Sequence, residues 1–336
     1  MRKDIIKNPK NLKQLQIHQI QLDPYGVCNA RCWFCPVAYE GNPIEGKEVM
    51  STELLEKIIK NIIEERDTNG IVNKNFNRLY TSHYNEILLY PHFEELLKIC
   101  KKYNIKFSLL SNGVALTNDK VNLIKKYGVV SDILLNIPAF DSETWSKRSG
   151  INIKNFDKLI SNIKYAEIEL FGLIRKGLFK IQINGVDRNS NWITKGNAFP
   201  SDLEYDELDK QIVCASKLFP KIQLIVDNNL VDRVGLLDNV FTNKPTIISK
   251  LQKGDNTKKV IGCNVGVEIG GRALGWLHIN SKGNAFLCCN DYHFEHKFGD
   301  FKTQTLKEFW GTDSHIEMVE NAFKTICSNC SAAIFE

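Results

Sequence analysis

Three cysteines lie close together near the start of the chain, at Cys28, Cys32 and Cys35. The chain has ten Cys among 336 residues, and three Cys at one fixed spacing arise by chance on the order of 0.01 times per chain. Three thiolates in one loop can hold three irons of a four-iron cluster and leave the fourth iron open to a small molecule. Zinc with a distant fourth ligand is the alternative, although structural zinc sites usually pair their Cys as C-x2-C or C-x4-C.

The run Cys28-x3-Cys32-x2-Cys35 has an aromatic residue before its last Cys and resembles the signature of the radical S-adenosylmethionine (SAM) superfamily. The resemblance implies that these three Cys ligate a [4Fe-4S] cluster whose open iron chelates the amino and carboxylate groups of SAM. In that family the reduced cluster cleaves SAM to methionine and a 5′-deoxyadenosyl radical. The aromatic residue is Phe34, which the resemblance places near the adenine of SAM.

The overall composition is that of a globular protein. A hydrophobic content of 43% predicts a sizeable core. The net charge of +5 comes from 44 basic and 39 acidic residues, and this small, dispersed excess does not predict a nucleic-acid partner. Neither a membrane span nor a signal peptide stands out, so we expect a cytoplasmic protein without a membrane partner. In a reducing compartment, metal binding explains ten Cys better than disulfides do.

Strand-like and helix-like segments alternate along the first two thirds of the chain. Six alternations within about 215 residues predict a parallel sheet with helices outside it, in the form of an open, partial barrel. Radical SAM enzymes share this partial (β/α)6 TIM-like form. The expected strands cover residues 18–22, 77–84, 106–110, 132–137, 179–183 and 221–226. The expected helices cover residues 53–66 with Ser51 as N-cap, 92–103, 118–127, a segment from about 155, and 205–218.

The turns that follow the strands are candidate cofactor contacts, because ligands of parallel α/β folds lie beyond the carboxyl ends of the strands. After the second strand the family often has Gly-Gly-Glu, which binds the SAM amino group. Here the sequence is Tyr84-Asn85-Glu86, and Glu86 keeps the acidic position. After the third strand, Ser111-Asn112-Gly113 resembles the Ser-Asn-Gly turn of the family. Gly113 would permit a positive φ and a close approach of the backbone.

Further candidates follow the fourth and fifth strands. Asn136 occupies a position where family members often place a polar residue near the SAM ribose. The segment around Arg148 and Gly150 resembles an arginine-glycine turn of the family, which implies that Arg148 contacts the SAM carboxylate. A surface arginine is the alternative. Gln182 and Asn184 are further polar residues that could face the pocket.

A second group of cysteines lies in the last quarter of the chain. A β-hairpin over residues 277–287, with its turn at Gly283, and a helix over residues 305–323 are expected between Cys263 and the final Cys pair. Gly283-x4-Cys288 and Cys327-x2-Cys330 resemble the shortened relative of the SPASM domain called Twitch. The resemblance implies that Cys263, Cys288, Cys327 and Cys330 hold an auxiliary [4Fe-4S] cluster. Cys289 competes with Cys288 for one ligand position, and a zinc ribbon built from the same thiolates is the alternative.

The alternation stops in the region 228–260, which we interpret as a bridge between two modules. We therefore divide the chain into a radical SAM partial barrel, residues 1–230, and a bridge with a SPASM/Twitch-like domain, residues 231–336. Cys100 and Cys214 lie in helical patterns and are expected to be structural thiols. His293 and His296 are expected at the surface.

The expected function is that of a radical SAM oxidoreductase. The 5′-deoxyadenosyl radical would abstract a hydrogen atom from a small polar substrate, such as a sugar or aminocyclitol, with overall dehydrogenation. A peptide-modifying radical SAM maturase that makes an epimer or a crosslink is the first alternative. A non-catalytic iron–sulfur or zinc protein is the second. The electron donor would be a reductase, a flavodoxin or a ferredoxin, and the sequence does not fix the substrate or the oligomeric state.

Overall fold

A computed structural model of the chain describes residues 15–32, 35–41, 48–81, 84–184, 202–227, 234, 257–265 and 271–336. The predicted adenine contact Phe34 lies outside these residues, as do most of the predicted bridge and the boundary between residues 230 and 231.

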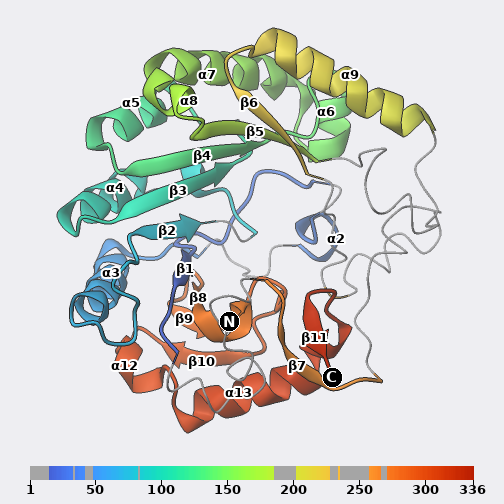
Figure 1. Cartoon of the computed structure of the whole chain (residues 1–336). Coiled ribbons are helices and arrows are strands. Elements are labelled where there is room, and N and C mark those ends of the chain that lie inside the picture. Colours follow the sequence, from blue (N-terminus) through green and yellow to red (C-terminus); the bar gives the residue numbers. More distant parts are fainter. Residues whose placement is uncertain are drawn as a thin grey trace.

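Within the described residues, a sheet of nine strands in the order β10-β9-β8-β1-β2-β3-β4-β5-β6 forms the centre of the molecule (Figure 1). Strands β1 to β6 pair with their neighbours in parallel. The strands are β1 (Gln19–Leu22), β2 (Arg78–Thr81), β3 (Lys106–Ser111), β4 (Val130–Asn136), β5 (Phe179–Asn184), β6 (Gln223–Asp227), β8 (Trp276–Ile279), β9 (Asn284–Phe286) and β10 (Lys297–Asp300). A separate antiparallel pair joins β7 (Val260–Cys263) to β11 (Ala333–Phe335).

Helices connect successive strands of the parallel part and cover its outer face (Figure 1). The helices of this part are α2 (Val37–Glu40), α3 (Thr52–Asp67), η2 (Ile87–Leu89), α4 (Phe93–Lys102), α5 (Asn118–Tyr127), α6 (Ser142–Ser149), η3 (Ile153–Asn155), α7 (Phe156–Glu169), α8 (Phe171–Arg175) and α9 (Asp202–Leu218). The C-terminal part contains α11 (Arg272–Gly275), α12 (Leu306–Phe309), α13 (Asp313–Lys324) and η7 (Ile326–Asn329). Six parallel strands with helices between them confirm the predicted partial (β/α)6 barrel, and the linear strand order leaves the sheet open.

The alternation of burial along the strands explains why one face of the sheet meets the helices. In β3, Phe107 and Leu109 are fully buried, whereas Ser108 and Leu110 between them are only half-buried. Side chains two apart point to the same face of a strand, so the apolar set packs under the helices and the other set faces away from them.

The helices follow their sequence signals closely. The side chain of Ser51 accepts a hydrogen bond from the backbone N–H of Leu54 and caps α3, as predicted. Helix α5 has the predicted bounds. The apolar side of α3 is buried against the sheet through Leu55, Ile58, Ile59, Ile62 and Ile63.

The predicted single helix over residues 305–323 is wrong, because the chain forms two helices there. Gly311 has a φ of +69°, a left-handed conformation that interrupts helical hydrogen bonding. Thr312 then caps α13 by accepting a hydrogen bond from the backbone N–H of His315 at 3.3 Å.

The predicted hairpin is present as β8 and β9, and Gly283 adopts a φ of +83° in its turn. The sequence did not predict that β8 pairs in parallel with β1, where Ile20 lies opposite Leu277. This pairing makes the hairpin a continuation of the barrel sheet, so strands of both predicted modules share one sheet.

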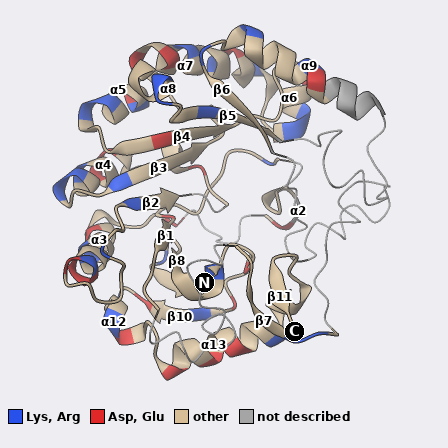
Figure 2. Ribbon diagram, viewed as in Figure 1, with Lys and Arg blue, Asp and Glu red and all other residues tan. Residues whose placement is uncertain are grey.

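Charges of both signs are interspersed along the outer helices (Figure 2). Lys126 and Lys125, for example, pair with Glu94 at 3.2 Å and Glu169 at 2.7 Å. In the part of the chain that the structure describes, no helix combines the length and the apolar character that crossing a bilayer requires.

Candidate active site

The first cysteine loop leaves the carboxyl end of β1, where a parallel sheet presents its ligands. The backbone N–H of Cys35 donates to the carbonyl of Cys32 at 2.9 Å, and the N–H of Ala30 donates to the sulfur of Cys28 at 3.4 Å. These bonds curl the loop back on itself. The three thiols are therefore close enough to act on one another electrostatically.

Burial dominates the chemistry of these thiols. It raises the pKa of Cys28 to about 12, and Glu86 and Cys35 add to the effect. Burial also raises the pKa of Cys32, and its two partner thiols act in the same direction. Buried thiolates therefore need positive charge beside them, which bound metal supplies.

Glu86 connects the ends of β2 and β3. Its carboxylate is 1% exposed and accepts hydrogen bonds from the backbone N–H of Asn112 at 2.8 Å and from the hydroxyl of Ser111 at 2.9 Å. A third bond, from the N–H of Leu88 at 3.2 Å, caps η2. Burial raises the pKa of Glu86 to about 7, although the three hydrogen bonds lower it.

The two predicted strand-end turns meet the cysteine loop. The backbone N–H of Glu86 donates to the carbonyl of Val27 at 2.9 Å, next to Cys28. The side-chain amide of Asn112 donates to Asn29 at 2.7 Å, inside the Cys motif. Gly113 has the expected positive φ, +80°. The structure thus brings Glu86, Ser111, Asn112 and Gly113 together beside the first cysteine set.

The segment around Arg148 also meets this loop, but it is a helix, α6, rather than a turn. Gly150 ends the helix in a left-handed conformation, and a Cβ there would lie 2.8 Å from the Cβ of Arg31. The N–H of Arg31 donates to the carbonyl of Ser149 at 2.7 Å. Arg148 itself is half-buried and donates to the carbonyl of Pro138 at 3.2 Å. Asn136, the last residue of β4, is likewise half-buried.

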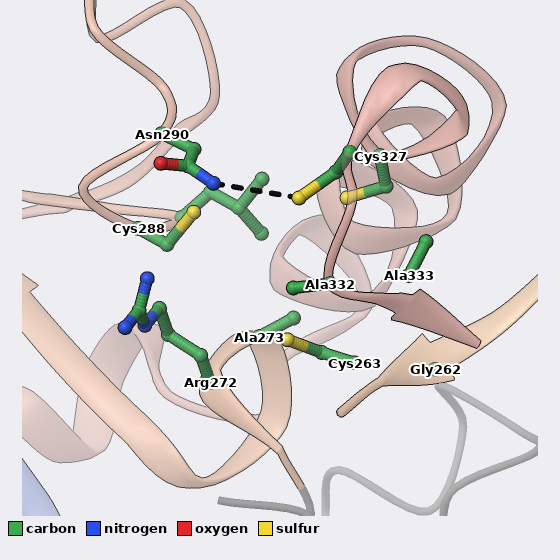
Figure 3. A pocket seen from close by; sticks show the side chains of 11 residues that line it. Gly262, Cys263, Arg272, Ala273, Cys288, Asn290, Cys327, Ala332 and Ala333 are labelled. Atoms are coloured by element: carbon green, nitrogen blue, oxygen red, sulfur yellow. Dashed lines mark hydrogen bonds between the residues drawn. The ribbon is translucent and has the colours of Figure 1, made fainter. Parts of the chain in front are cut away.

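The second cysteine set lines one pocket in the C-terminal part (Figure 3). Cys263 ends β7, Cys288 follows β9, and Cys327 and Cys330 lie in and after η7. Pairing of β7 with β11 places Cys263 opposite Ala333, which brings the first Cys to the last pair. None of the ten Cys forms a disulfide.

Comparison with protein-family models matches two separate parts of the chain. Residues 22–171 match the model of the Radical SAM superfamily, and residues 272–331 match that of SPASM, an iron-sulfur cluster-binding domain. The chain therefore carries a Radical SAM domain and a C-terminal SPASM domain. No curated protein matches this chain.

Solved structures with the same fold include the following three. BtrN in complex with AdoMet and 2-DOIA is 13% identical with a TM-score of 0.52, and the match covers 95% of this chain and 93% of BtrN. Streptococcus suis SuiB bound to the precursor peptide SuiA is 16% identical with a TM-score of 0.57, and the match covers 96% of this chain and 71% of SuiB. Native anSMEcpe with bound AdoMet is 15% identical with a TM-score of 0.55, and the match covers 94% of this chain and 88% of anSMEcpe. At these identities the likeness supports the fold alone.

The radical SAM domain implies a [4Fe-4S] cluster and SAM, and the SPASM domain implies auxiliary iron–sulfur binding. The donor sets fit these groups, with three clustered thiols beside open strand ends and four thiols around one pocket. Among the described residues, no three Cys, His or carboxylate side chains converge as the ligands of a single metal ion do. A four-iron cluster binds each thiolate at a different iron, so its ligands need not converge on one point.

The structure separates the two neighbouring Cys of the SPASM domain. Cys288 lines the pocket, whereas the sulfur of Cys289 accepts a hydrogen bond from the guanidinium of Arg272 at 2.9 Å. This geometry favours Cys288 as the ligand, in agreement with the glycine spacing. Burial raises the pKa of Cys288 well above its ordinary value, Cys289 adds to this, and the Arg272 cation acts in the opposite direction.

Sequence reasoning missed two contacts near the cysteine sets. Tyr84 stands where the family often has glycine, and its hydroxyl donates to the carbonyl of Cys289 at 2.6 Å. Its ring contacts the ring of Tyr292 edge to face, with 4.7 Å between the two ring centres, and Cys35 packs against this pair. Tyr84 thus links the radical SAM loop to the SPASM domain. An aromatic residue in a glycine position was the signal that could have indicated it.

The expectation that His296 lies at the surface is wrong, although His293 is exposed as expected. His296 is 7% exposed and bridges Asp291 at 3.2 Å and Thr325 at 3.1 Å through its two ring nitrogens. The bridge fixes the loop after Cys288 to the segment before Cys327. Asp291 and His296 are five residues apart, a spacing too common to predict this role.

Proposed function

We propose that this protein is a radical SAM oxidoreductase that dehydrogenates a small polar substrate, such as a sugar or aminocyclitol. Cys28, Cys32 and Cys35 would hold the SAM-binding cluster, and Glu86, Asn112, Asn136 and Arg148 would contact SAM. When bound, the reduced cluster supplies the electron that cleaves SAM to methionine and a 5′-deoxyadenosyl radical, which takes a hydrogen atom from the substrate.

The single observation that carries the proposal is the second pocket, in which four thiols surround one space (Figure 3). Four protein thiolates saturate a four-iron cluster, so Cys263, Cys288, Cys327 and Cys330 would leave no open iron for substrate. Such a site suits electron transfer. A carbon radical that bears a hydroxyl group becomes a carbonyl by losing one proton and one electron, and the electron needs an acceptor.

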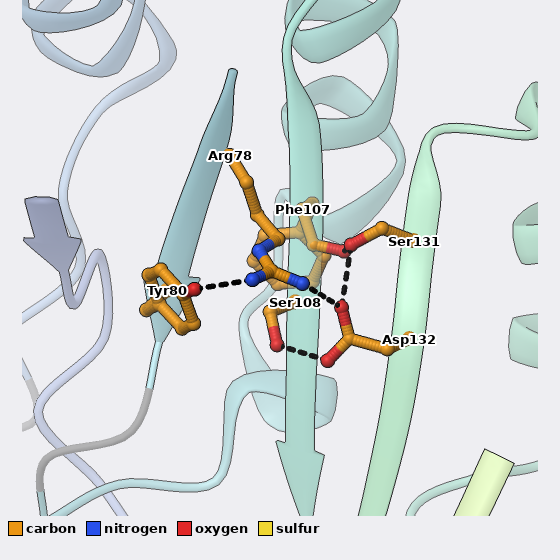
Figure 4. Close-up of polar contacts among 6 residues, drawn as sticks. All are labelled: Arg78, Tyr80, Phe107, Ser108, Ser131 and Asp132. Carbon is orange, nitrogen blue, oxygen red and sulfur yellow. Dashed lines mark hydrogen bonds and ion pairs between the residues drawn. The ribbon is translucent and has the colours of Figure 1, made fainter. Parts of the chain in front are cut away.

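The face of the sheet opposite the helices carries a cluster of polar side chains on β2, β3 and β4, which supports a small polar substrate (Figure 4). Arg78 on β2 donates to Asp132 on β4 at 2.9 Å and to the hydroxyl of Tyr80 at 2.5 Å. Ser108 and Ser131 donate to the same carboxylate at 2.5 and 2.6 Å. The side chains of Arg78 and Asp132 remain 39% and 25% exposed. Hydroxyl groups of a sugar or cyclitol find both donors and acceptors on such a surface.

BtrN supports the same substrate class, because it binds a second small molecule, 2-DOIA, beside AdoMet and matches this chain along nearly its whole length. Two other neighbours favour a second candidate, a peptide-modifying maturase. SuiB binds the precursor peptide SuiA, and anSMEcpe binds the peptide Cp18Cys. The polar surface and the small-molecule ligand of BtrN lead us to place dehydrogenation first.

The test uses anaerobically reconstituted protein with SAM, dithionite and a panel of polyols and aminocyclitols deuterated on their hydroxyl-bearing carbons. We expect one panel member to give deuterated 5′-deoxyadenosine together with a carbonyl product, both detected by mass spectrometry. A matched panel of peptides deuterated at their α-carbons serves as the comparison. Deuterium transfer from peptides alone, or an epimerised or crosslinked product, would contradict the proposal and support the second candidate.

A further inference from the structure

Arg272 stands at the wall of the four-cysteine pocket, at the start of α11 (Figure 3). The chain turns at Gly271, which has a φ of +78°. A Cβ at this position would lie 2.6 Å from the carbonyl oxygen of Cys263. Only glycine fits this close approach, which places the start of α11, and with it Arg272, against the end of β7 at Cys263.

Two contacts hold the guanidinium in place. It donates to the sulfur of Cys289 at 2.9 Å. Its central carbon lies 4.9 Å from the centre of the Trp276 ring, a cation–π geometry. Cys289 and Trp276 lie outside the pocket lining, so they fix the cation beside the ligand thiols without occupying a ligand position.

The charges that act on the pocket are arranged asymmetrically. Burial raises the pKa of the Cys288 and Cys330 thiols, and the Arg272 cation opposes this effect at both. Burial also raises the pKa of Cys327, where Asp291 is a minor contributor in the same direction. The carboxylate of Asp291 is itself bound by His296. Asn290 adds a neutral donor, its amide lying 3.4 Å from the sulfur of Cys330.

We propose that Arg272 is a positioning residue that makes the auxiliary site a better electron acceptor, by holding a fixed positive charge in the lining of the pocket that its four thiolates share. Reduction adds one electron to the group that these thiolates bind and makes its net charge more negative by one. A nearby cation stabilises that added charge more than it stabilises the oxidised state. The reduction potential therefore rises. The inference rests on the proposed function in that an acceptor of the substrate electron benefits from a raised potential.

The test is a redox titration, followed by electron paramagnetic resonance, of the full chain reconstituted anaerobically with iron and sulfide. SAM added to a parallel sample changes the signal of the N-terminal site and thereby separates the two signals. Arg272→Gln removes the charge, Arg272→Lys keeps it, and Lys307→Gln removes one exposed charge from the same domain as the matched control.

We expect Arg272→Gln to lower the equilibrium constant for one-electron reduction of the auxiliary site at least tenfold, which is 59 mV for a one-electron couple. Arg272→Lys should stay near the wild-type potential, and Lys307→Gln should match it. An Arg272→Gln shift no larger than that of Lys307→Gln overturns the proposal, and so do equal shifts in Arg272→Gln and Arg272→Lys.

Iron content decides how a damaged variant is interpreted. If Arg272→Gln retains only about half of the wild-type iron, Arg272→Lys decides alone: a wild-type potential supports the charge effect, and a lowered one overturns it. The potentials need no substrate, so a failure to dehydrogenate any compound would reject the proposed function while leaving this measurement intact.

Discussion

Glu86 gives the sharpest test of the electrostatics around the first cysteine loop. Its carboxyl group is fully buried, and burial raises its pKa from 4.5 to about 7 against the opposing effect of three hydrogen bonds. A carboxyl group whose folded pKa is raised binds its proton more tightly in the native protein than in the unfolded chain. The stabilisation is therefore fully present below pH 4.5 and is lost as the pH rises through about 7.

The magnitude follows from the size of the shift. One pKa unit corresponds to about 1.4 kcal/mol, so the free energy of unfolding should fall by about 3.5 kcal/mol across the whole transition. About 2.5 kcal/mol of this change lies between pH 5 and pH 8. Glu86→Gln cannot titrate and lacks this term. The amide leaves one of the three donors without its acceptor, which costs about 1–3 kcal/mol at every pH and cancels from the pH dependence.

The assay is denaturant unfolding of wild type and Glu86→Gln at pH 5 and pH 8, followed by circular dichroism under anaerobic conditions. We expect the variant to gain about 2.5 kcal/mol relative to wild type between the two pH values. Glu308→Gln is the control, because the pKa of exposed Glu308 is lowered by its bonds to Thr305. Between pH 5 and pH 8, the free energy of unfolding of Glu308→Gln should fall slightly relative to wild type, which is opposite in sign to the change expected for Glu86→Gln.

A second readout is direct. The carboxylic acid C=O band of the wild type should disappear with a midpoint near pH 7 in infrared spectra and be absent from Glu86→Gln. Two results would contradict a raised pKa of Glu86: a difference in unfolding free energy between wild type and Glu86→Gln that does not change with pH, or an infrared midpoint near pH 4.5. Glu86 would then be ionised in the native protein, with its three hydrogen bonds outweighing burial.

Three further predictions concern the metal content and the packing. The anaerobically reconstituted protein should bind about eight irons per chain, and stoichiometric zinc with little iron by elemental analysis would contradict the two-cluster account. Tyr84→Phe should lose about 1–3 kcal/mol in denaturant unfolding, because the carbonyl of Cys289 loses its donor. Half-buried Tyr103→Phe is the control and should change stability by less than about 0.5 kcal/mol, because its hydroxyl donates to Glu56, whose side chain is 37% exposed and can bind water instead. Gly113→Ala should lower the free energy of unfolding more than Gly128→Ala in the same assay. Both glycines have a positive φ, but only a Cβ at residue 113 would clash, 2.7 Å from a methyl carbon of Leu159. Equal losses would show that Leu159 moves aside.

Local sequence signals predicted most of the barrel. The strands alternate in burial because one face lies under helices, and the Ser51 cap and the bounds of α5 follow from short-range chemistry. The sequence did not reveal the break between α12 and α13, because the helical spacing of apolar residues continues across Gly311. The helical backbone conformation ends there, since Gly311 has a positive φ. An isolated glycine inside a helical pattern is compatible with either outcome.

The contacts that join the two cysteine sets were not predictable in this way. The parallel pairing of β8 with β1, the bond from Tyr84 to Cys289 and the burial of His296 all connect residues far apart in the sequence or depend on the tertiary fold. Cysteine spacing identified the two sets, since metal ligation imposes local spacing. It could not reveal how closely the barrel and the SPASM domain are connected.

The central claim is that the three-cysteine set generates the radical and the four-cysteine set serves a later step. The most direct measurement is 5′-deoxyadenosine formed from SAM and dithionite, in wild type, in Cys35→Ala and in a Cys327→Ala, Cys330→Ala double variant shown by circular dichroism to be folded. We expect Cys35→Ala to form none, and the double variant to form some but to complete no substrate turnover. Normal turnover in the folded double variant, or 5′-deoxyadenosine from Cys35→Ala, would contradict it.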